Sequence, residues 1–140
     1  MDENCIFCKI ISGKIPAAKV YEDAHCIAFL DINPAVKGHA LVVPKTHAET
    51  LLDLTAEDLA AAMTVVQNLS GAIVNAVSAK GFNLLQNNRK VAGQVIPHVH
   101  FHIIPRYDGD NQDFSWKHTK YGEGELDEYK NSIVKRMGKK

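Results

Sequence analysis

The sequence has no excess of charge of either sign. Lysine and arginine together number 16, aspartate and glutamate also number 16, and the formal net charge at pH 7 is +0. Such a chain generates no long-range field that would attract a nucleic-acid backbone or an anionic membrane. The balance argues against partners held by bulk charge, so any bound anion must be met by local hydrogen-bond donors.

We expect neither a leader segment nor a membrane-spanning run in this sequence. The opening segment, residues 1–4, contains two acidic side chains, so no basic segment precedes an apolar one in the manner of a secretory signal. We expect no stretch long and apolar enough to cross a bilayer. These absences predict a cytoplasmic protein without a membrane partner.

Cysteine is scarce, and its number is odd. Three thiols cannot all pair with one another, and without an export signal a close pair indicates metal or redox chemistry rather than a structural disulfide. Cys5 and Cys8 have this close spacing. Cys26 lies in the apolar run 26–30, where a thiol is typically a small core residue, and we assign it no role.

The length and composition are those of an ordinary globular protein. The chain has 140 residues, which is a common size for one domain. Its residues are 46% hydrophobic and 23% charged, which argues against disorder. We therefore predict a single domain over residues 1–140.

Apolar patterning predicts an α+β fold. Short apolar runs between turn residues predict five strands, at residues 19–22, 26–30, 39–44, 82–86 and 98–104. Thr55 followed by Glu57 and Asp58 is typical of a helix start, and apolar residues then recur every three or four positions, which predicts a long helix over 55–79. A short helix is expected near the C-terminus. With few helices between strands, the sheet should be mostly antiparallel.

Three histidines alternate with apolar residues in the last predicted strand. His98, His100 and His102 lie two positions apart. In a strand this spacing places the imidazoles on one face and the intervening apolar side chains on the other, against the core. Neighbouring histidines are then about 6.6 Å apart along the strand and the outer pair about 13 Å, so one zinc ion would not bind all three.

This arrangement of three histidines indicates a reactive site. A single histidine on a half-exposed strand is usually solvated, whereas three at perfect alternation opposite an apolar face are not expected by chance. A neutral imidazole is a good nucleophile at phosphorus when its neighbours fix its tautomer and orientation. We therefore expect the three histidines to have different roles.

The run His98-x-His100-x-His102, followed by two isoleucines, resembles the defining motif of the histidine-triad (HIT) nucleotide hydrolases and transferases. The similarity extends in order over roughly the first 107 residues, and includes the segments 15–17, 21–23, 28–32, 38–47, 87 and 93–94. The resemblance implies a HIT-like fold, with a five-stranded sheet, one long helix and short N- and C-terminal helices. A C-terminal extension from about residue 108 to 140 lies outside the shared part.

In that family the middle histidine attacks the α-phosphorus of a nucleoside phosphoramidate, mixed anhydride or dinucleoside polyphosphate and becomes nucleotidylated. The resemblance implies that His100 is the nucleophile, that His102 orients it and supports the phosphate, and that His39 stands behind them in a relay, with His98 completing the catalytic set. It implies a purine nucleotide substrate and no catalytic metal. The alternatives are a catalytically weak nucleotide-binding regulatory protein and a metal-dependent hydrolase with two of the triad histidines on zinc.

A nucleotide site is implied as well. Asp31 matches the ribose-binding acid, although an acid before Asn33-Pro34 is also typical of a turn. The apolar slot for the base would be formed by Phe7, Ile10, Phe29, Ile32 and Leu41, and the phosphate contacts by Asn87, Gly93, Gln94, the backbone of Val95, His100 and His102. Val95 departs from the family, which commonly has serine or threonine there to help the leaving group. The leaving group therefore stays open.

Cys5 and Cys8 have the spacing of a zinc half-site. A thioredoxin-like redox pair would need a preceding strand, and none is predicted before Cys5. Several bacterial HIT proteins hold structural zinc with such a pair and two histidines, which implies that His47 and His98 complete the set. Zinc there would clamp the N-terminus onto the catalytic strand, with His100 left free.

Family members usually dimerise through the long helix and an adjoining strand, and their C-terminal tail often reaches the partner's active site. We expect a homodimer here by analogy. His25 and His118 lie in a turn and in a polar segment, where histidines are typically solvated, and we assign them no role.

Overall fold

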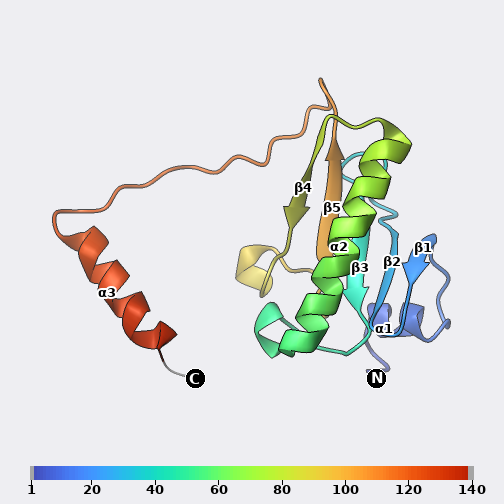
Figure 1. Cartoon of the computed structure of the whole chain (residues 1–140), viewed down its shortest axis with the longest axis horizontal. Helices are drawn as coiled ribbons and strands as arrows, with labels where there is room; N and C mark the ends of the chain where they lie inside the picture. Colours follow the sequence, from blue (N-terminus) through green and yellow to red (C-terminus); the bar gives the residue numbers. More distant parts are fainter. Residues whose placement is uncertain (1, 139–140) are drawn as a thin grey trace.

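The computed structural model describes residues 2–138 (Figure 1), so the extreme ends of the domain expected over 1–140 lie outside the described residues. Two short 3-10 helices, Leu51–Asp53 and Lys90–Ala92, interrupt the connections. The principal elements in chain order are α1 (Ile6–Ile11), β1 (Lys19–Glu22), β2 (Cys26–Leu30), β3 (Ala40–Pro44), α2 (Ala56–Val77), β4 (Gly81–Leu85), β5 (Phe101–Arg106) and α3 (Glu125–Met137). The predicted α+β class is confirmed.

The five strands form one sheet in the order β1-β2-β3-β5-β4, and every neighbouring pair is antiparallel. β1 and β2, the first two predicted strands, are adjacent and antiparallel. β5, which carries His102, lies between β3 and β4, and His102 pairs with Leu41 on one side and Leu85 on the other. Of the three histidines, His102 therefore lies on an interior strand.

Side chains alternate between the two faces of the sheet along each strand. Both faces are apolar, and each carries its own cluster of buried residues. Toward α2, which crosses one face in Figure 1, the buried cluster includes Val42, Val99, Phe101 and Ile103. On the other face, strand residues pack against the N-terminal segment and α1; the buried members of this cluster are Cys5, Phe7, Cys8, Ile27, Phe29, Leu41 and Val43. The histidines alternate with Val99, Phe101 and Ile103, so they face the α1 side.

α2 begins and ends close to the predicted bounds. The Thr55 hydroxyl accepts a hydrogen bond from the Asp58 amide at 3.0 Å, and Ser78 ends the helix in the left-handed conformation. Within the described residues, α2 is long and apolar enough to cross a membrane by length and composition alone, which corrects the expectation that no stretch would be. Its apolar side packs on the sheet, including Val66 and Ile73, as in an amphipathic core helix.

The last strand differs from its prediction. It begins at Phe101 rather than His98 and runs through Pro105 to Arg106, whereas the prediction ended it at Ile104. β3 pairs only with residues 101–103, and the Val99 amide instead donates to the Ala48 carbonyl oxygen at 2.7 Å. Pro105 pairs with Phe82 in β4. His98 and His100 therefore lie in an irregular segment that leads into the strand.

The C-terminal extension is fastened where it leaves the sheet. The Arg106 guanidinium donates to both carboxylate oxygens of Asp110, at 2.7 and 2.9 Å, and Asp110 also accepts from the amides of Tyr107 and Gln112. Beyond this turn the chain is extended and ends in α3, which lies apart from the sheet in Figure 1. The predicted C-terminal helix is present, with Leu126, Ile133 and Met137 exposed.

Ile103 is fully buried, so its truncation tests the core beneath the triad strand. We expect Ile103→Ala to lower the free energy of unfolding by about 2–5 kcal/mol, through lost burial and a residual cavity. Denaturant unfolding measures this change. Ile32→Ala, at a side chain that is 87% exposed, is the matched control and should change stability little; equal effects of the two variants would contradict this description of the core.

Candidate active site and metal centre

The rings of His100 and His102 lie next to each other on the α1 face. Their centroids are 4.9 Å apart, closer than the spacing along an ideal strand. The Phe7 ring, from α1, meets the His100 ring edge to face at 5.0 Å. His100 is only 8% exposed. This packing holds the central imidazole in one orientation.

Hydrogen bonding determines the tautomer of His100. Its Nδ1 lies 2.7 Å from the His98 carbonyl oxygen, which can only accept, so Nδ1 carries the proton. Burial lowers the pKa of His100, although this hydrogen bond and the nearby Asp31 charge oppose the change. In the neutral ring the lone pair is therefore on Nε2, the atom that a nucleophilic imidazole needs free.

A second chain of hydrogen bonds orients His102. The Ala35 amide donates to Nδ1 of His39 at 3.0 Å, so the His39 proton is on Nε2, which lies 2.9 Å from Nδ1 of His102. His102 then accepts at Nδ1 and carries its own proton on Nε2. Burial, followed by the neighbouring His100 and His39, lowers the pKa of His102 to about 4. His102 is thus a neutral hydrogen-bond donor.

Asp31, His39 and His102 also converge closely enough to be considered as metal ligands. The Ala35 amide argues against that role for His39. A neutral imidazole bound to a metal through Nε2 carries its proton on Nδ1, yet Nδ1 of His39 already faces an N–H donor. The geometry fits the predicted relay better than a metal site.

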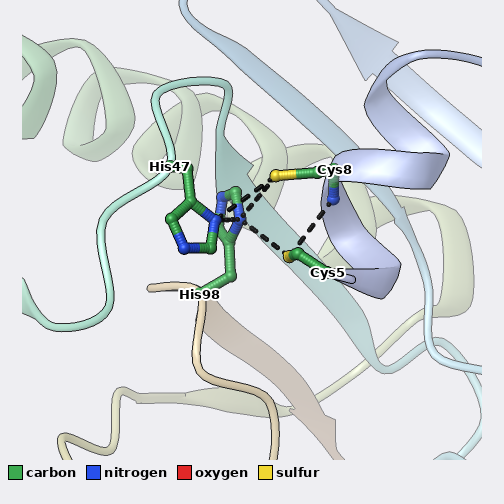
Figure 2. Close-up of side chains that lie close together, drawn as sticks. All are labelled: Cys5, Cys8, His47 and His98. Atoms are coloured by element: carbon green, nitrogen blue, oxygen red, sulfur yellow. Dashed lines mark hydrogen bonds between the residues drawn. The ribbon is translucent and has the colours of Figure 1, made fainter. Parts of the chain in front are cut away.

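Figure 2 shows Cys5, Cys8, His47 and His98 pointing toward one another. Nδ1 of His98 lies 3.3 Å from Sγ of Cys5 and 3.6 Å from Sγ of Cys8. Nδ1 of His47 lies 3.3 Å from Sγ of Cys8 and 3.2 Å from Nδ1 of His98. Nε2 of His98 donates to the Pro44 carbonyl oxygen at 2.8 Å, so its Nδ1 lone pair faces the thiols.

These distances fit a tetrahedral zinc site. With Zn–S near 2.3 Å and Zn–N near 2.0–2.1 Å, ligand atoms around one ion are about 3.3–3.8 Å apart, close to the separations observed. Burial raises the pKa of the Cys5 thiol, and a bound cation would reverse that effect. The Cys8 amide donates to Sγ of Cys5 at the start of α1, which also supports a thiolate. The four residues predicted as ligands are the four that converge.

The residues predicted for the base slot are only partly brought together. Phe7, Phe29 and Leu41 are buried in one apolar cluster, with Ile10 packed against it. Ile32 is 87% exposed and is not part of that cluster. Asp31 has the turn role weighed for it, since Oδ1 accepts from the Asn33 amide at 2.9 Å. Its Oδ2 lies 3.7 Å from Nε2 of His39, which places the carboxylate beside the His39–His102 pair.

In the predicted phosphate loop, the Gln94 side chain is turned inward. Its Oε1 accepts from the Arg89 amide at 2.6 Å, and its Nε2 donates to the carbonyl oxygens of Glu49 and Ile96. Gln94 therefore shapes the loop, because its side-chain amide is engaged with backbone groups of the protein. Gly93 has φ +96, and a Cβ there would lie 3.4 Å from Nδ2 of Asn87. Val95 is exposed at the surface.

Arg89 has an unusual backbone conformation that sequence reasoning missed. With φ 75 and ψ 158 it occupies a region that is populated essentially only by glycine. Holding another residue there costs about 1–3 kcal/mol. The Gln94 side chain supports this conformation through the 2.6 Å bond to the Arg89 amide. No residue type in the loop signals this conformation in advance, because it arises from the tertiary contact with Gln94.

Comparison with known proteins identifies the family. The HIT domain family matches residues 12–109, and the chain belongs to it. Among its relatives, Protein hit of Bacillus subtilis is 48% identical over 138 residues, which cover 96% of this chain and 95% of that protein. Adenosine 5'-monophosphoramidase hnt1 of Schizosaccharomyces pombe is 47% identical over 103 residues, which cover 74% of each chain.

Solved structures agree with the fold. The crystal structure of a HIT family member from Bacillus subtilis superposes with a TM-score of 0.90 at 46% identity, covering 96% of this chain and 97% of that one. A Zn-bound histidine triad family protein from Mycobacterium smegmatis superposes with a TM-score of 0.75 at 38% identity, covering 83% and 84%. The predicted HIT-like fold is confirmed.

The lowered pKa of His102 predicts acid sensitivity. The pKa of His102 is 6.5 in the unfolded chain and about 4 in the folded one. Between these pH values the unfolded chain binds a proton that the folded chain excludes. The free energy of unfolding should therefore rise with pH across this window. Denaturant unfolding at several pH values, on the wild type and on His102→Gln, measures it.

The comparison with His102→Gln isolates one residue, because the remaining buried histidines titrate in both proteins. We expect a smaller slope in the variant. An equal slope in the two proteins would show that the pKa of His102 is not lowered in the folded chain.

Proposed function

We propose that the protein is a hydrolase or nucleotidyl transferase that acts at the α-phosphorus of nucleoside phosphoramidates or polyphosphates through a nucleotidyl intermediate on His100. The observation that carries this proposal is the proton-free Nε2 of His100, fixed by the hydrogen bond from Nδ1 to the His98 carbonyl oxygen. The name of the fission yeast relative, an adenosine 5'-monophosphoramidase, supports a purine nucleotide substrate.

In the proposed reaction, Nε2 of His100 forms a bond to phosphorus while the bond to the leaving group breaks. The ring becomes a positively charged phosphoimidazolium, and the Nδ1 proton still donates to the His98 carbonyl oxygen, which stabilises that charge. Water or another acceptor then attacks the same phosphorus and releases the nucleotide. The first step requires no base, because the attacking nitrogen carries no proton.

His102 would stabilise the developing charge on the phosphate. Its Nε2 proton is available for a non-bridging or leaving oxygen, and His39 keeps Nδ1 occupied so that this tautomer persists. Asp31 would bind the ribose hydroxyls, while Phe7, Phe29 and Leu41 would contact the base. Asn87, Gly93 and the Val95 backbone would bind the phosphate, and Gln94 would hold their loop in shape.

We propose that Cys5, Cys8, His47 and His98 bind a structural zinc ion. Zinc bound there would join the N-terminal segment to the segment that carries the triad and would fix the His98 ring. Because the His98 carbonyl oxygen orients His100, the ion would act on catalysis through position alone. The similarity of this chain to the Zn-bound mycobacterial protein supports the assignment.

We also propose that the chain forms a homodimer, as predicted by analogy, and that the protein is cytoplasmic. β4 is an edge strand, and its Phe82 and Leu84 side chains are 47% and 45% exposed. Beyond Asp58, α2 has no charged residue. An uncharged helix surface beside an apolar edge strand is typical of a surface covered by another subunit.

His100→Ala tests the nucleophile. We expect kcat with adenosine 5'-phosphoramidate to fall by about three orders of magnitude or more, because the covalent step is lost. Mass spectrometry of acid-quenched wild-type enzyme should show a nucleotidyl adduct that is absent from the variant. His25→Ala, at an exposed turn, is the matched control and should retain activity. Tight nucleotide binding without turnover by the wild type would instead support the regulatory alternative.

Zinc removal separates a structural from a catalytic ion. We expect about one zinc per chain, and we expect Cys8→Ser to lose zinc and to melt at a lower temperature. When zinc is chelated, activity should fall no faster than the folded structure is lost, as measured by circular dichroism. Immediate loss of activity in a chain whose melting temperature is unchanged would contradict the structural role.

A further inference from the structure

A cavity of about 420 Å³ lies beside the proposed phosphate loop. Gly93, Gln94 and Val95 form one part of its wall, and Pro97, directly before His98, forms another. A group bound in this cavity would therefore be adjacent to the phosphate loop and to the segment leading to His100.

Two cations, Arg89 and Lys90, also line this cavity. Glu49 contributes a carboxylate to the same wall, so the cations outnumber it. Asp53, whose carboxylate is near Arg89, is engaged elsewhere, because Oδ2 accepts from both the amide and the hydroxyl of Thr50. In a chain with no net charge, this is a local excess of positive charge beside the proposed phosphate loop.

The conformation of Arg89 provides an independent observation. The residue is held in a backbone region that favours glycine, and the buried Gln94 side chain secures it there. Strained backbone clusters at binding and active sites, which agrees with a functional role for this loop. A hydrogen bond from the Gln94 amide to the Arg89 carbonyl oxygen, at 3.1 Å, closes the loop that presents both cations.

We infer that this cavity binds the leaving group and that Arg89 and Lys90 select a leaving group with negative charge, namely a phosphate chain. The inference rests on the proposed function and specifies its substrate class. Val95 agrees with it, since its side chain has no proton to give and the oxygen of a departing phosphate chain needs none at neutral pH.

With diadenosine tetraphosphate, Nε2 of His100 bonds to one α-phosphorus and the bond from that phosphorus to the bridging oxygen breaks. The electron pair stays on that oxygen, which leaves as part of ATP. Water then attacks the adenylyl phosphorus, the N–P bond breaks with its electron pair returning to Nε2, and AMP and a proton are released. Arg89 and Lys90 stabilise the charge that develops on the departing chain.

The test compares two substrates that share the adenylyl group. The ratio of kcat/KM for diadenosine tetraphosphate to that for adenosine 5'-phosphoramidate is measured for the wild type, Arg89→Gly and Lys90→Ala. We expect each substitution to lower this ratio about tenfold, as for loss of one charge-assisted hydrogen bond. Arg89→Lys, which keeps the charge, should recover part of the ratio.

Arg89→Gly also separates function from folding. Because glycine suits this backbone conformation, the variant should melt at a higher temperature than the wild type while its ratio falls. Lys80→Ala, at an exposed lysine away from the cavity lining, is the control and should leave the ratio unchanged.

An unchanged ratio in both Arg89→Gly and Lys90→Ala would overturn the inference and leave the proposed function standing. If the wild type turns over neither substrate, the proposed function itself fails. The two failures are therefore distinguishable in one set of measurements.

Discussion

The hydrogen bond from Nδ1 of His100 to the His98 carbonyl oxygen joins the two halves of the site. The backbone of His98 fixes the tautomer of the proposed nucleophile, while its ring lies among the two thiols and His47. One residue thus serves the proposed metal site with its side chain and the proposed nucleophile with its main chain. Whatever holds His98 in place also holds Nδ1 of His100 in place.

A second constraint is that the histidines of the site are kept neutral. Burial lowers the pKa of His39, His98, His100 and His102, and each ring meets a partner that decides which nitrogen carries its proton. Three of these partners are backbone groups, of Ala35, Pro44 and His98. The fold therefore sets proton positions largely through its main chain, which side-chain substitutions alter only indirectly.

The resemblance to the HIT family implied that His47 and His98 join Cys5 and Cys8, and the four residues do converge. Sequence patterns predicted the elements and the antiparallel sheet, because alternation is a local property, and they marked Cys5 and Cys8 as a zinc half-site by spacing. They placed the start of β5 too early, since strand pairing depends on how far β3 extends. The resemblance placed Gln94 among the phosphate-binding residues, and in the structure its side chain hydrogen-bonds to the backbones of Glu49, Arg89 and Ile96. The backbone partners of the histidines and the conformation of Arg89 leave no clear trace in residue types, because they arise only from tertiary arrangement.

The C-terminal extension lies apart from the sheet, and this limits the stability of its helix. α3 has 13 residues, and an isolated helix of that length is marginal in water. Its Leu126, Ile133 and Met137 side chains are exposed on a segment that lies apart from the sheet. No side chain of α3 is buried within the described residues, so packing adds little to its stability and the helix should unwind more readily than α2.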